Sequence, residues 1–289
     1  MQYYGAVYRP PSEARSLIVQ CTLGCSHNRC AFCNMYRKKN FSVRSLEEVL
    51  ADLTEARQYL PYVRRIFLAD GDALILPTEY LLEVLHFIRE HYPECERVTA
   101  YASTRCLMRK TDAELRSLRE AGLAMVYVGL ETGNEELRAK YDKGVTVEEI
   151  VTHSLRAKEA GMALSVTAIN GMGGTACSEQ HAVDTARALS RIKPEYAALL
   201  TLRVYSGTPL KEWIDAGSFT MLGPLELAQE CRLILQEIDS EGTVFRSNHA
   251  SNYLPLKGTL NADREALIAL LDKALAGELR FRSAVELGL

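Results

Sequence analysis

Short apolar runs alternate with segments of helical periodicity along most of the chain. Six runs rich in β-branched, aliphatic or aromatic residues predict strands, at about Leu17–Thr22, Arg65–Asp70, Arg97–Ser103, Leu123–Leu130, Ala163–Asn170 and Tyr196–Val204. Several of them are almost continuously apolar, as expected for strands that are buried on both faces. Strands that alternate with helices predict βαβ units and a parallel sheet.

The helices between these strands carry recognisable start and stop signals. Three capping boxes predict helix starts, at Ser45 with Glu48, Thr111 with Glu114, and Thr146 with Glu149. Two helices end in the same tripeptide, Glu-Ala-Gly, at 120–122 and 159–161. Glycine at this position takes the left-handed conformation that ends a helix. This repeat of the βα unit favours a barrel over two unrelated domains.

The six strands end by residue 204, and the rest of the chain does not supply two further clear βα units. Helices are predicted at 224–240 and 262–276, with a short strand candidate within 243–253. The sequence therefore predicts an α/β fold, a partial TIM barrel of the (βα)6 type with a C-terminal helical extension. We expect residues 1–215 to form the barrel core and residues 216–289 to pack on it rather than form an independent domain.

Composition narrows the function classes. The chain has 289 residues, of which 47% are hydrophobic and 25% charged, so it can bury a sizeable core. The net charge of −3 gives no broad cationic surface, so nucleic acid is not an expected partner. No window approaches the ~18 consecutive apolar residues of a membrane helix, and the start lacks a secretory apolar segment. The expected location is the cytoplasm.

Four of the eight cysteines fall between positions 21 and 33. In a reducing compartment such a cluster indicates metal binding. Cys25, Cys30 and Cys33, spaced C-x4-C-x2-C, could hold three irons of a cubane cluster, which leaves the fourth iron open for chemistry. A zinc ion held by the same cysteines and His27 is the alternative.

This loop resembles the cluster motif of the radical S-adenosylmethionine (SAM) superfamily. The family motif is C-x3-C-x2-C after the first barrel strand, with an aromatic residue before the last cysteine, a position that Phe32 fills here. The first gap is one residue longer in this chain, which leaves Cys21 as an alternative first ligand. The Gly24-Cys25 pair resembles the family's turn and favours Cys25.

Further motifs at the strand ends resemble the same superfamily. Asp70-Gly71-Asp72 resembles a variant of the Gly-Gly-Glu segment that binds the methionine ammonium of SAM, although a strand-end turn or a divalent-metal site would use the same residues. Residues 129–133, Gly-Leu-Glu-Thr-Gly, resemble the subgroup of oxygen-independent coproporphyrinogen oxidase, the methylthiotransferases and the elongator-type enzymes. There the resemblance implies a ribose contact for Glu131.

Three other strand-end residues complete this set. Gly171 belongs to a glycine turn like the one that lets the backbone approach adenine in these enzymes. Arg105 and Arg203 follow the third and sixth predicted strands. Each is a candidate partner for the SAM carboxylate, or a member of a surface ion pair.

The resemblance implies a [4Fe-4S] cluster and SAM as cofactors. It also implies reductive cleavage of SAM to a 5′-deoxyadenosyl radical, with electrons from a donor such as flavodoxin or ferredoxin. The radical would abstract hydrogen from a small-molecule or peptide substrate that the sequence does not identify. Ser247–Tyr253, dense in hydrogen-bond donors, could line the substrate side or pack the C-terminal helix.

Two other functions remain open at this stage. A zinc-stabilised, non-catalytic interaction protein would use the same cysteines. A radical SAM enzyme that modifies RNA would use the basic residues near the cysteine loop, which are Arg29, Arg37, Lys38, Lys39 and Arg44.

Overall fold

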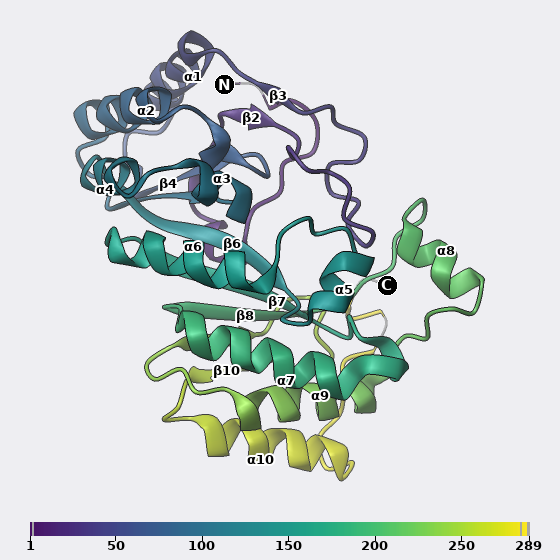
Figure 1. The fold of residues 1–289 in the computed structure, drawn as a ribbon. Helices are drawn as coiled ribbons and strands as arrows, with labels where there is room; N and C mark the ends of the chain where they lie inside the picture. The colour runs from purple at the N-terminus through teal and green to yellow at the C-terminus, as the bar shows by residue number, and fades with distance from the viewer. Residues whose placement is uncertain (2, 284, 288–289) are drawn as a thin grey trace. The chain divides into compact units, whose positions relative to one another are not determined.

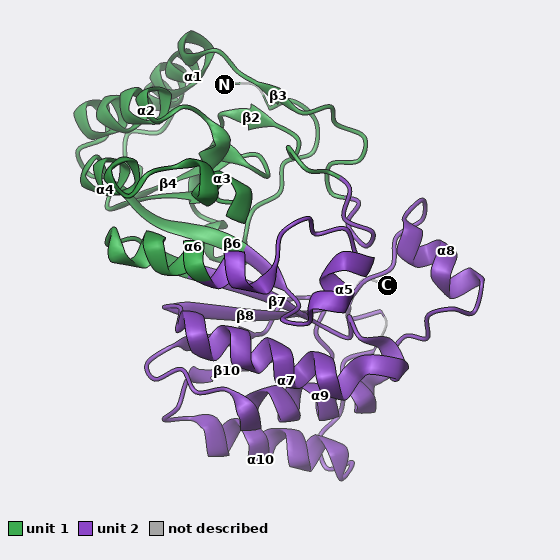
Figure 2. Cartoon of the chain, viewed as in Figure 1, with its two compact units in different colours: residues 1–28, 35–128, 152–164 green, residues 29–34, 129–151, 165–289 purple. Residues whose placement is uncertain are grey.

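The computed structural model describes residues 1, 3–283 and 285–287. The chain divides into two compact units (Figure 2). Unit 1 comprises residues 1–28, 35–128 and 152–164, and unit 2 comprises residues 29–34, 129–151 and 165–289. The division passes through β6 (Leu123–Glu131) and through the cysteine loop, so that Cys25 belongs to unit 1 and Cys30 and Cys33 to unit 2.

Unit 1 contains a parallel sheet in the order β1-β4-β5-β6, of which Figure 1 labels β4 and β6. Its strands are β1 (Leu17–Gln20), β4 (Arg65–Ala69), β5 (Arg97–Tyr101) and the first part of β6. The helices are α1 (Leu46–Tyr59), α2 (Thr78–His91), α3 (Thr104–Arg109), α4 (Asp112–Glu120) and the later part of α6 (Val147–Glu159). A small ladder pairs β2 (Thr22–Leu23) with β3 (Ser42–Val43), and two 3-10 turns span Pro11–Glu13 and Ala73–Ile75.

Unit 2 also consists of strands that alternate with helices. Its strands follow the order β7 (Ala163–Asn170), β8 (Tyr196–Thr201), β9 (Val244–Ser247) and β10 (Leu256–Thr259). The first three are parallel, and β10 pairs with β9 in the antiparallel sense. The helices are α5 (Glu135–Lys140), α7 (Gly174–Ile192), α8 (Pro209–Asp215), α9 (Pro224–Glu237) and α10 (Arg264–Leu275). Helix α9 packs against both α7 and α10.

The predicted α/β class and its mostly parallel strands are confirmed, and all six predicted strands are present. The capping boxes are also formed. Ser45 Oγ accepts from Glu48 N at 3.2 Å while the Glu48 carboxylate accepts from Ser45 N at 2.9 Å. Thr111 and Thr146 bind Glu114 and Glu149 in the same reciprocal way. Each box satisfies two backbone donors that a helix start would otherwise leave without partners.

The C-terminal extension differs in one respect from the helical segment that the sequence predicts. It contributes two strands, of which β9 falls within the short candidate at 243–253 and β10 was not predicted. Strand β10 has only four residues, Leu-Lys-Gly-Thr, and its glycine weakens any strand signal. Pairing with β9, rather than local propensity, determines its conformation.

Candidate cofactor site at the strand ends

Asp70, directly after β4, is a buried residue of unit 1 that accepts hydrogen bonds from several segments. Its carboxylate accepts from Gln20 Nε2 at 3.1 and 3.2 Å, from Gly24 N at 3.0 Å and from Lys39 Nζ at 2.7 Å, and it is fully buried. Charge-assisted bonds of this kind are among the stronger ones in proteins. Asp70 therefore ties the segment before Cys25, and the segment around Lys39, to the end of β4.

Asp72 joins the cysteine loop, through Ser26, to the segment that follows β5. It is fully buried and accepts from the Ser26 hydroxyl, from Ser103 N at 3.2 Å and from Cys106 Sγ at 2.7 Å. Burial, followed by the charge of Asp72, raises the pKa of the Cys106 thiol well above its usual value. Cys106 is therefore a protonated hydrogen-bond donor.

Gly71, between these two acids, brings backbone close to the cysteine loop. A Cβ at this position would lie 2.6 Å from Tyr36 Cε2 and 3.3 Å from Cys25 Cβ. Any larger residue would have to displace the tyrosine ring. The absence of a side chain thus lets the Asp70–Asp72 segment pack against Cys25.

Cys30 and Cys33 lie in one turn of unit 2. Cys33 N donates to Cys30 O at 3.1 Å. Between them, Ala31 N donates to Tyr141 O at 3.0 Å, and Ala31 O accepts from Leu210 N at 3.0 Å. These two bonds fix the turn to the end of α5 and the start of α8.

Glu131 and Lys143 form an ion pair close to this turn. Glu131 Oε1 lies 3.3 Å from Lys143 Nζ, and both side chains are largely buried, at 15% and 13% exposure. The Lys143 ammonium also lies 5.6 Å from the ring centroid of Phe32, within range of a cation–π contact. Burial opposes the charge on Lys143, but the charges of Glu131 and of a Cys30 thiolate offset it, and the pKa of Lys143 is raised.

The backbone around Glu131 is shaped to bring its carboxylate into this position. Glu131 has a φ of 63°, in the left-handed region that non-glycine residues seldom adopt. A Cβ on Gly129 would collide with the Glu131 carboxylate, which folds back over that glycine. Arg138 then fixes the strand end, because its buried Nη1 donates to Leu130 O at 2.7 Å and to Thr132 O at 3.2 Å. A strained conformation that neighbours enforce is typical of a functional site.

The glycine turn after β7 rests on helix α9. Gly171 has a φ of 93°, and its N–H donates to Glu230 Oε1 at 2.5 Å. The neighbouring Asn170 donates through Nδ2 to Leu227 O at 2.9 Å. Burial raises the pKa of Glu230 to about 7, although the hydrogen bonds from Ser178 and Gly171 oppose the shift. The sequence reading did not find Glu230.

A buried imidazole, that of His181 in α7, joins the ends of β6 and β7. His181 Nε2 lies 3.0 Å from Ile169 O, which can only accept, so this nitrogen carries the proton. Its Nδ1, 2.8 Å from Thr132 Oγ1, is then the acceptor. Burial lowers the pKa of His181 to about 4, so the ring is neutral at pH 7.

The remaining predicted residues are Arg105, Arg203 and the polar segment Ser247–Tyr253. Arg105 is half-buried in α3. Arg203, after β8, donates through Nη2 to Leu287 O at 3.3 Å. In the polar segment after β9, Asn252 Nδ2 donates to Leu199 O at 2.7 Å and Ser251 Oγ accepts from Thr201 N at 3.2 Å. These two residues hold the loop to β8.

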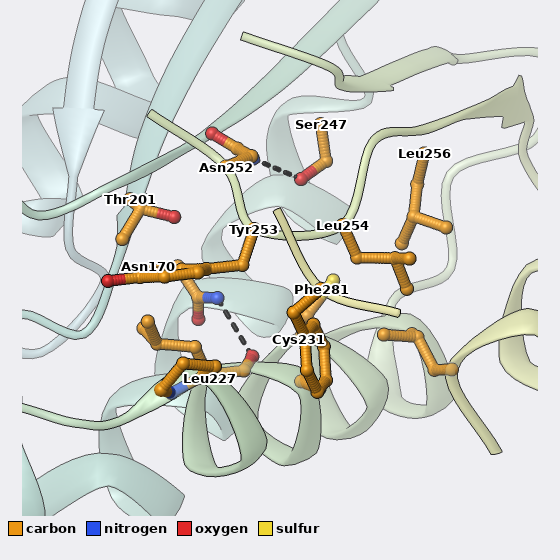
Figure 3. Close-up of a pocket in the computed structure, with 13 residues that line it drawn as sticks. Asn170, Thr201, Leu227, Cys231, Ser247, Asn252, Tyr253, Leu254, Leu256 and Phe281 are labelled. Atoms are coloured by element: carbon orange, nitrogen blue, oxygen red, sulfur yellow. Dashed lines mark hydrogen bonds between the residues drawn. The ribbon is translucent and has the colours of Figure 1, made fainter. Parts of the chain in front are cut away.

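A small cavity of about 20 Å³ lies in unit 2 between the ends of β7 and β8, helix α9 and the segment after β9 (Figure 3). Its wall combines polar side chains such as Asn170 and Ser247 with apolar ones such as Leu227 and Phe281. Asn170 Oδ1 is buried there without a hydrogen-bond partner. A space of this size with a polar wall has room for one water molecule.

Comparison with known proteins identifies the family. The model of the radical SAM superfamily matches residues 19–189. The chain belongs to the radical SAM superfamily. Membership implies a [4Fe-4S] cluster and SAM as cofactors, and it favours the iron–sulfur interpretation of the cysteine loop over zinc. Among curated proteins, no sequence matches the chain.

Solved structures of radical SAM proteins share the fold at low sequence identity. The methyltransferase TsrM from Kitasatospora setae, with tryptophan and a SAM analogue bound, is 21% identical over 71% of this chain and 40% of its own, with a TM-score of 0.56. Methylornithine synthase (PylB) is 18% identical over 93% and 84%, and coproporphyrinogen III oxidase (HemN) from Escherichia coli is 16% identical over 78% and 54%, both with TM-scores of 0.56. The chain spans only about two fifths of the length of TsrM. These likenesses confirm the partial-barrel fold.

The residues of the cysteine loop fit the cluster that the superfamily carries. Cys25, Cys30 and Cys33 are all half-buried, and thiolates are the donors that a [4Fe-4S] cluster requires. The cations of Lys143 and Arg138 lie near Cys30. Within the described residues, no three His, Cys, Asp or Glu side chains are already gathered as a metal site. In the same residues, no helix has the length and apolar character needed to cross a bilayer.

Proposed function

We propose that this radical SAM enzyme holds its [4Fe-4S] cluster through Cys25, Cys30 and Cys33 and generates a 5′-deoxyadenosyl radical from SAM. The observation that carries the proposal lies in unit 2. There the Lys143 ammonium lies near Cys30 and the Phe32 ring, in the Cys30–Cys33 turn, which is called the cluster turn below. The same ammonium pairs with the candidate ribose ligand Glu131. A predicted cluster ligand and a predicted nucleotide ligand therefore share one cation.

Cys25 rather than Cys21 is the proposed first ligand. Cys21 is fully buried, its N–H donates to Ala69 O at 2.6 Å, and burial raises the pKa of its thiol to about 12. The Cys21 side chain has no exposed surface through which a cluster could reach its sulfur. Cys25 is half-buried and follows Gly24, which has a left-handed φ of 77°.

When bound, the reduced cluster supplies the electron that cleaves the sulfonium of SAM. The chain's own contribution is to bind and orient SAM. Asp70 and Asp72 already accept several hydrogen bonds each, so the backbone carbonyls of the Asp70–Asp72 segment are the proposed acceptors for the methionine ammonium. Glu131 is the proposed acceptor for the ribose hydroxyls and Gly171 the proposed contact for adenine. Arg105 and Arg203 are the proposed partners for the carboxylate.

A small-molecule or peptide substrate is favoured over RNA. Three of the five basic residues near the cysteine loop pair with carboxylates of the chain itself. Lys39 pairs with Asp70 at 2.7 Å, the buried Arg44 with Asp52 at 2.6 Å, and the exposed Arg29 with Asp142 at 3.4 Å. Fewer cations are then left to contact a phosphate backbone. An electron donor such as flavodoxin or ferredoxin is the proposed redox partner, and the cytoplasm stays the expected location.

His249 is the proposed substrate-side residue of the segment after β9. Its Nδ1 accepts from Ser251 N at 3.1 Å, so Nε2 carries the proton and is the donor of the neutral ring. Replacement of His249 by alanine should abolish stimulation of SAM cleavage by a candidate substrate and leave the substrate-free rate unchanged. Equal loss of both rates would refute a substrate-only role.

Anaerobic reconstitution of single cysteine variants tests the proposal. Cys25→Ser, Cys30→Ser and Cys33→Ser should each lose most of the iron, the sulfide and the brown absorbance of the cluster. Cys21→Ser is the matched control and should retain them. Loss in Cys21→Ser together with retention in Cys25→Ser would overturn the ligand assignment, and zinc as the only metal in the wild type would overturn the function.

A further inference from the structure

Helix α9 reaches the glycine turn after β7 from a distant part of the chain. We propose that Glu230, on this helix, is a positioning residue that shapes the Gly171 turn for the adenosyl part of SAM. The inference rests on the proposed function, because it assumes that SAM lies against this turn. It also extends the SAM site beyond residues 1–215, into the C-terminal extension.

The contacts of Glu230 account for both of its oxygens. Oε1 accepts from Gly171 N at 2.5 Å, and Oε2 accepts from Ser178 Oγ at 2.5 Å. The side chain is 2% exposed. It therefore joins the turn to the first part of α7, close to Cys177, where the helix has non-helical backbone angles.

Helix α9 holds the turn at a second point as well. Leu227, one helical turn before Glu230, accepts from Asn170 Nδ2 at 2.9 Å. Its Cδ2 would lie 3.1 Å from a Cβ on Gly171, so the leucine packs closely over that glycine. Two consecutive residues at the end of β7 are thus fixed by one helix.

A carboxyl group is energetically unfavourable at this buried position. Burial of an ionisable group costs free energy unless its bonds are good, and an apolar residue of similar volume is often neutral or stabilising in such places. Glu230 follows Leu227 by three residues and precedes Ile234 by four, which places it on the apolar face of α9. Stability alone does not explain it, whereas a turn whose N–H must be held in one orientation does.

The surroundings keep the carboxyl in place without forming a strong ion pair. His181 Nε2 in α7 lies 3.7 Å from Glu230 Oε1, but it donates to Ile169 O, and the ring is neutral. Because His181 also contacts Thr132, the same buried network reaches the strand end that carries Glu131. Glu230 therefore belongs to a network that connects the proposed adenine and ribose contacts.

The test compares Glu230→Leu with Glu230→Gln and with the control Glu237→Leu, an exposed position on the same helix. SAM affinity is measured by equilibrium dialysis on reconstituted protein, and hydrogen exchange of the Gly171–Gly173 amides is measured without SAM. Glu230→Leu should weaken SAM binding about tenfold, since the buried hydrogen bond that orients the Gly171 N–H is lost. Its KM for SAM should rise more than its kcat falls, with unchanged iron content. Glu230→Gln, whose amide oxygen can accept from Gly171 N, should restore most of the affinity.

Hydrogen exchange keeps the test decisive even if Glu230→Leu does not fold. In the wild type the Gly171 amide should exchange slowly, and fast exchange there would overturn the inference. Equal SAM affinity in Glu230→Leu and the wild type would overturn it as well. A wild type that holds the cluster but binds no SAM would instead refute the proposed function, so the two failures are distinguishable.

Discussion

Glu131 Oε1 lies 3.3 Å from Lys143 Nζ, and the pair joins the end of β6 to the cluster turn of unit 2. Lys143 faces three groups of this site at once, the Glu131 carboxylate, the Phe32 ring and the charge of Cys30. A change at Glu131 should therefore affect nucleotide binding before it affects the fold.

Glu131→Gln tests the ribose contact. The amide keeps the shape of the side chain but loses the charge that a vicinal diol and Lys143 both favour. We expect SAM affinity to fall about 10- to 100-fold, as for the loss of a hydrogen bond to a charged group. Glu136→Gln, an exposed position in the following helix, is the matched control. Unchanged affinity in Glu131→Gln would remove this residue from the site.

Asp70→Ala tests whether the Asp70 carboxylate fixes the loop before Cys25. The change leaves the Lys39 ammonium and the Gly24 N–H without their acceptor, and loss of one partner from a buried ion pair typically costs about 3–5 kcal/mol. Urea unfolding of the metal-free protein measures the loss. Asp239→Ala, which breaks an exposed pair with Lys193 at 3.4 Å, should have a far smaller effect. Similar losses in both variants would contradict the role of Asp70.

The pH dependence of stability tests the neutral state of His181. Because burial lowers the folded-state pKa of His181 to about 4, the unfolded chain binds this proton first as the pH falls below about 6.5. The stability advantage of the wild type over His181→Gln should therefore shrink between pH 6.5 and pH 4, by up to about 3 kcal/mol. Glu230 acts in the opposite direction, since its raised pKa costs stability as the pH rises from about 4.5 to 7. The comparison with the variant separates the two, and a difference that does not vary with pH would contradict the lowered pKa of His181 in the folded protein.

Local sequence signals predicted the strands and helix starts well. The capping boxes at Ser45, Thr111 and Thr146 are formed because each depends only on residues three positions apart. The motif residues Phe32 and Glu131 could be named from the resemblance to the superfamily, and the structure brings both to Lys143. The domain boundary at residue 215 and the individual roles of the site residues stay predictions.

Long-range partners could not be predicted from the sequence. Glu230 lies 59 positions from Gly171, and no local pattern connects them. A signal was nevertheless present, because a glutamate at an apolar-stripe position of α9 is a conflict that a buried hydrogen bond resolves. Lys39 is a similar case, since it stands in a basic stretch near the cysteine loop and pairs with the buried Asp70, 31 positions away.

Formation of 5′-deoxyadenosine tests the central claim most directly. The reconstituted protein is incubated anaerobically with dithionite and SAM, and products are followed by liquid chromatography and mass spectrometry, with Cys30→Ser as control. The account predicts 5′-deoxyadenosine and methionine from the wild type and none from the variant. A fully reconstituted wild type that makes no 5′-deoxyadenosine, with or without candidate substrates, would contradict it.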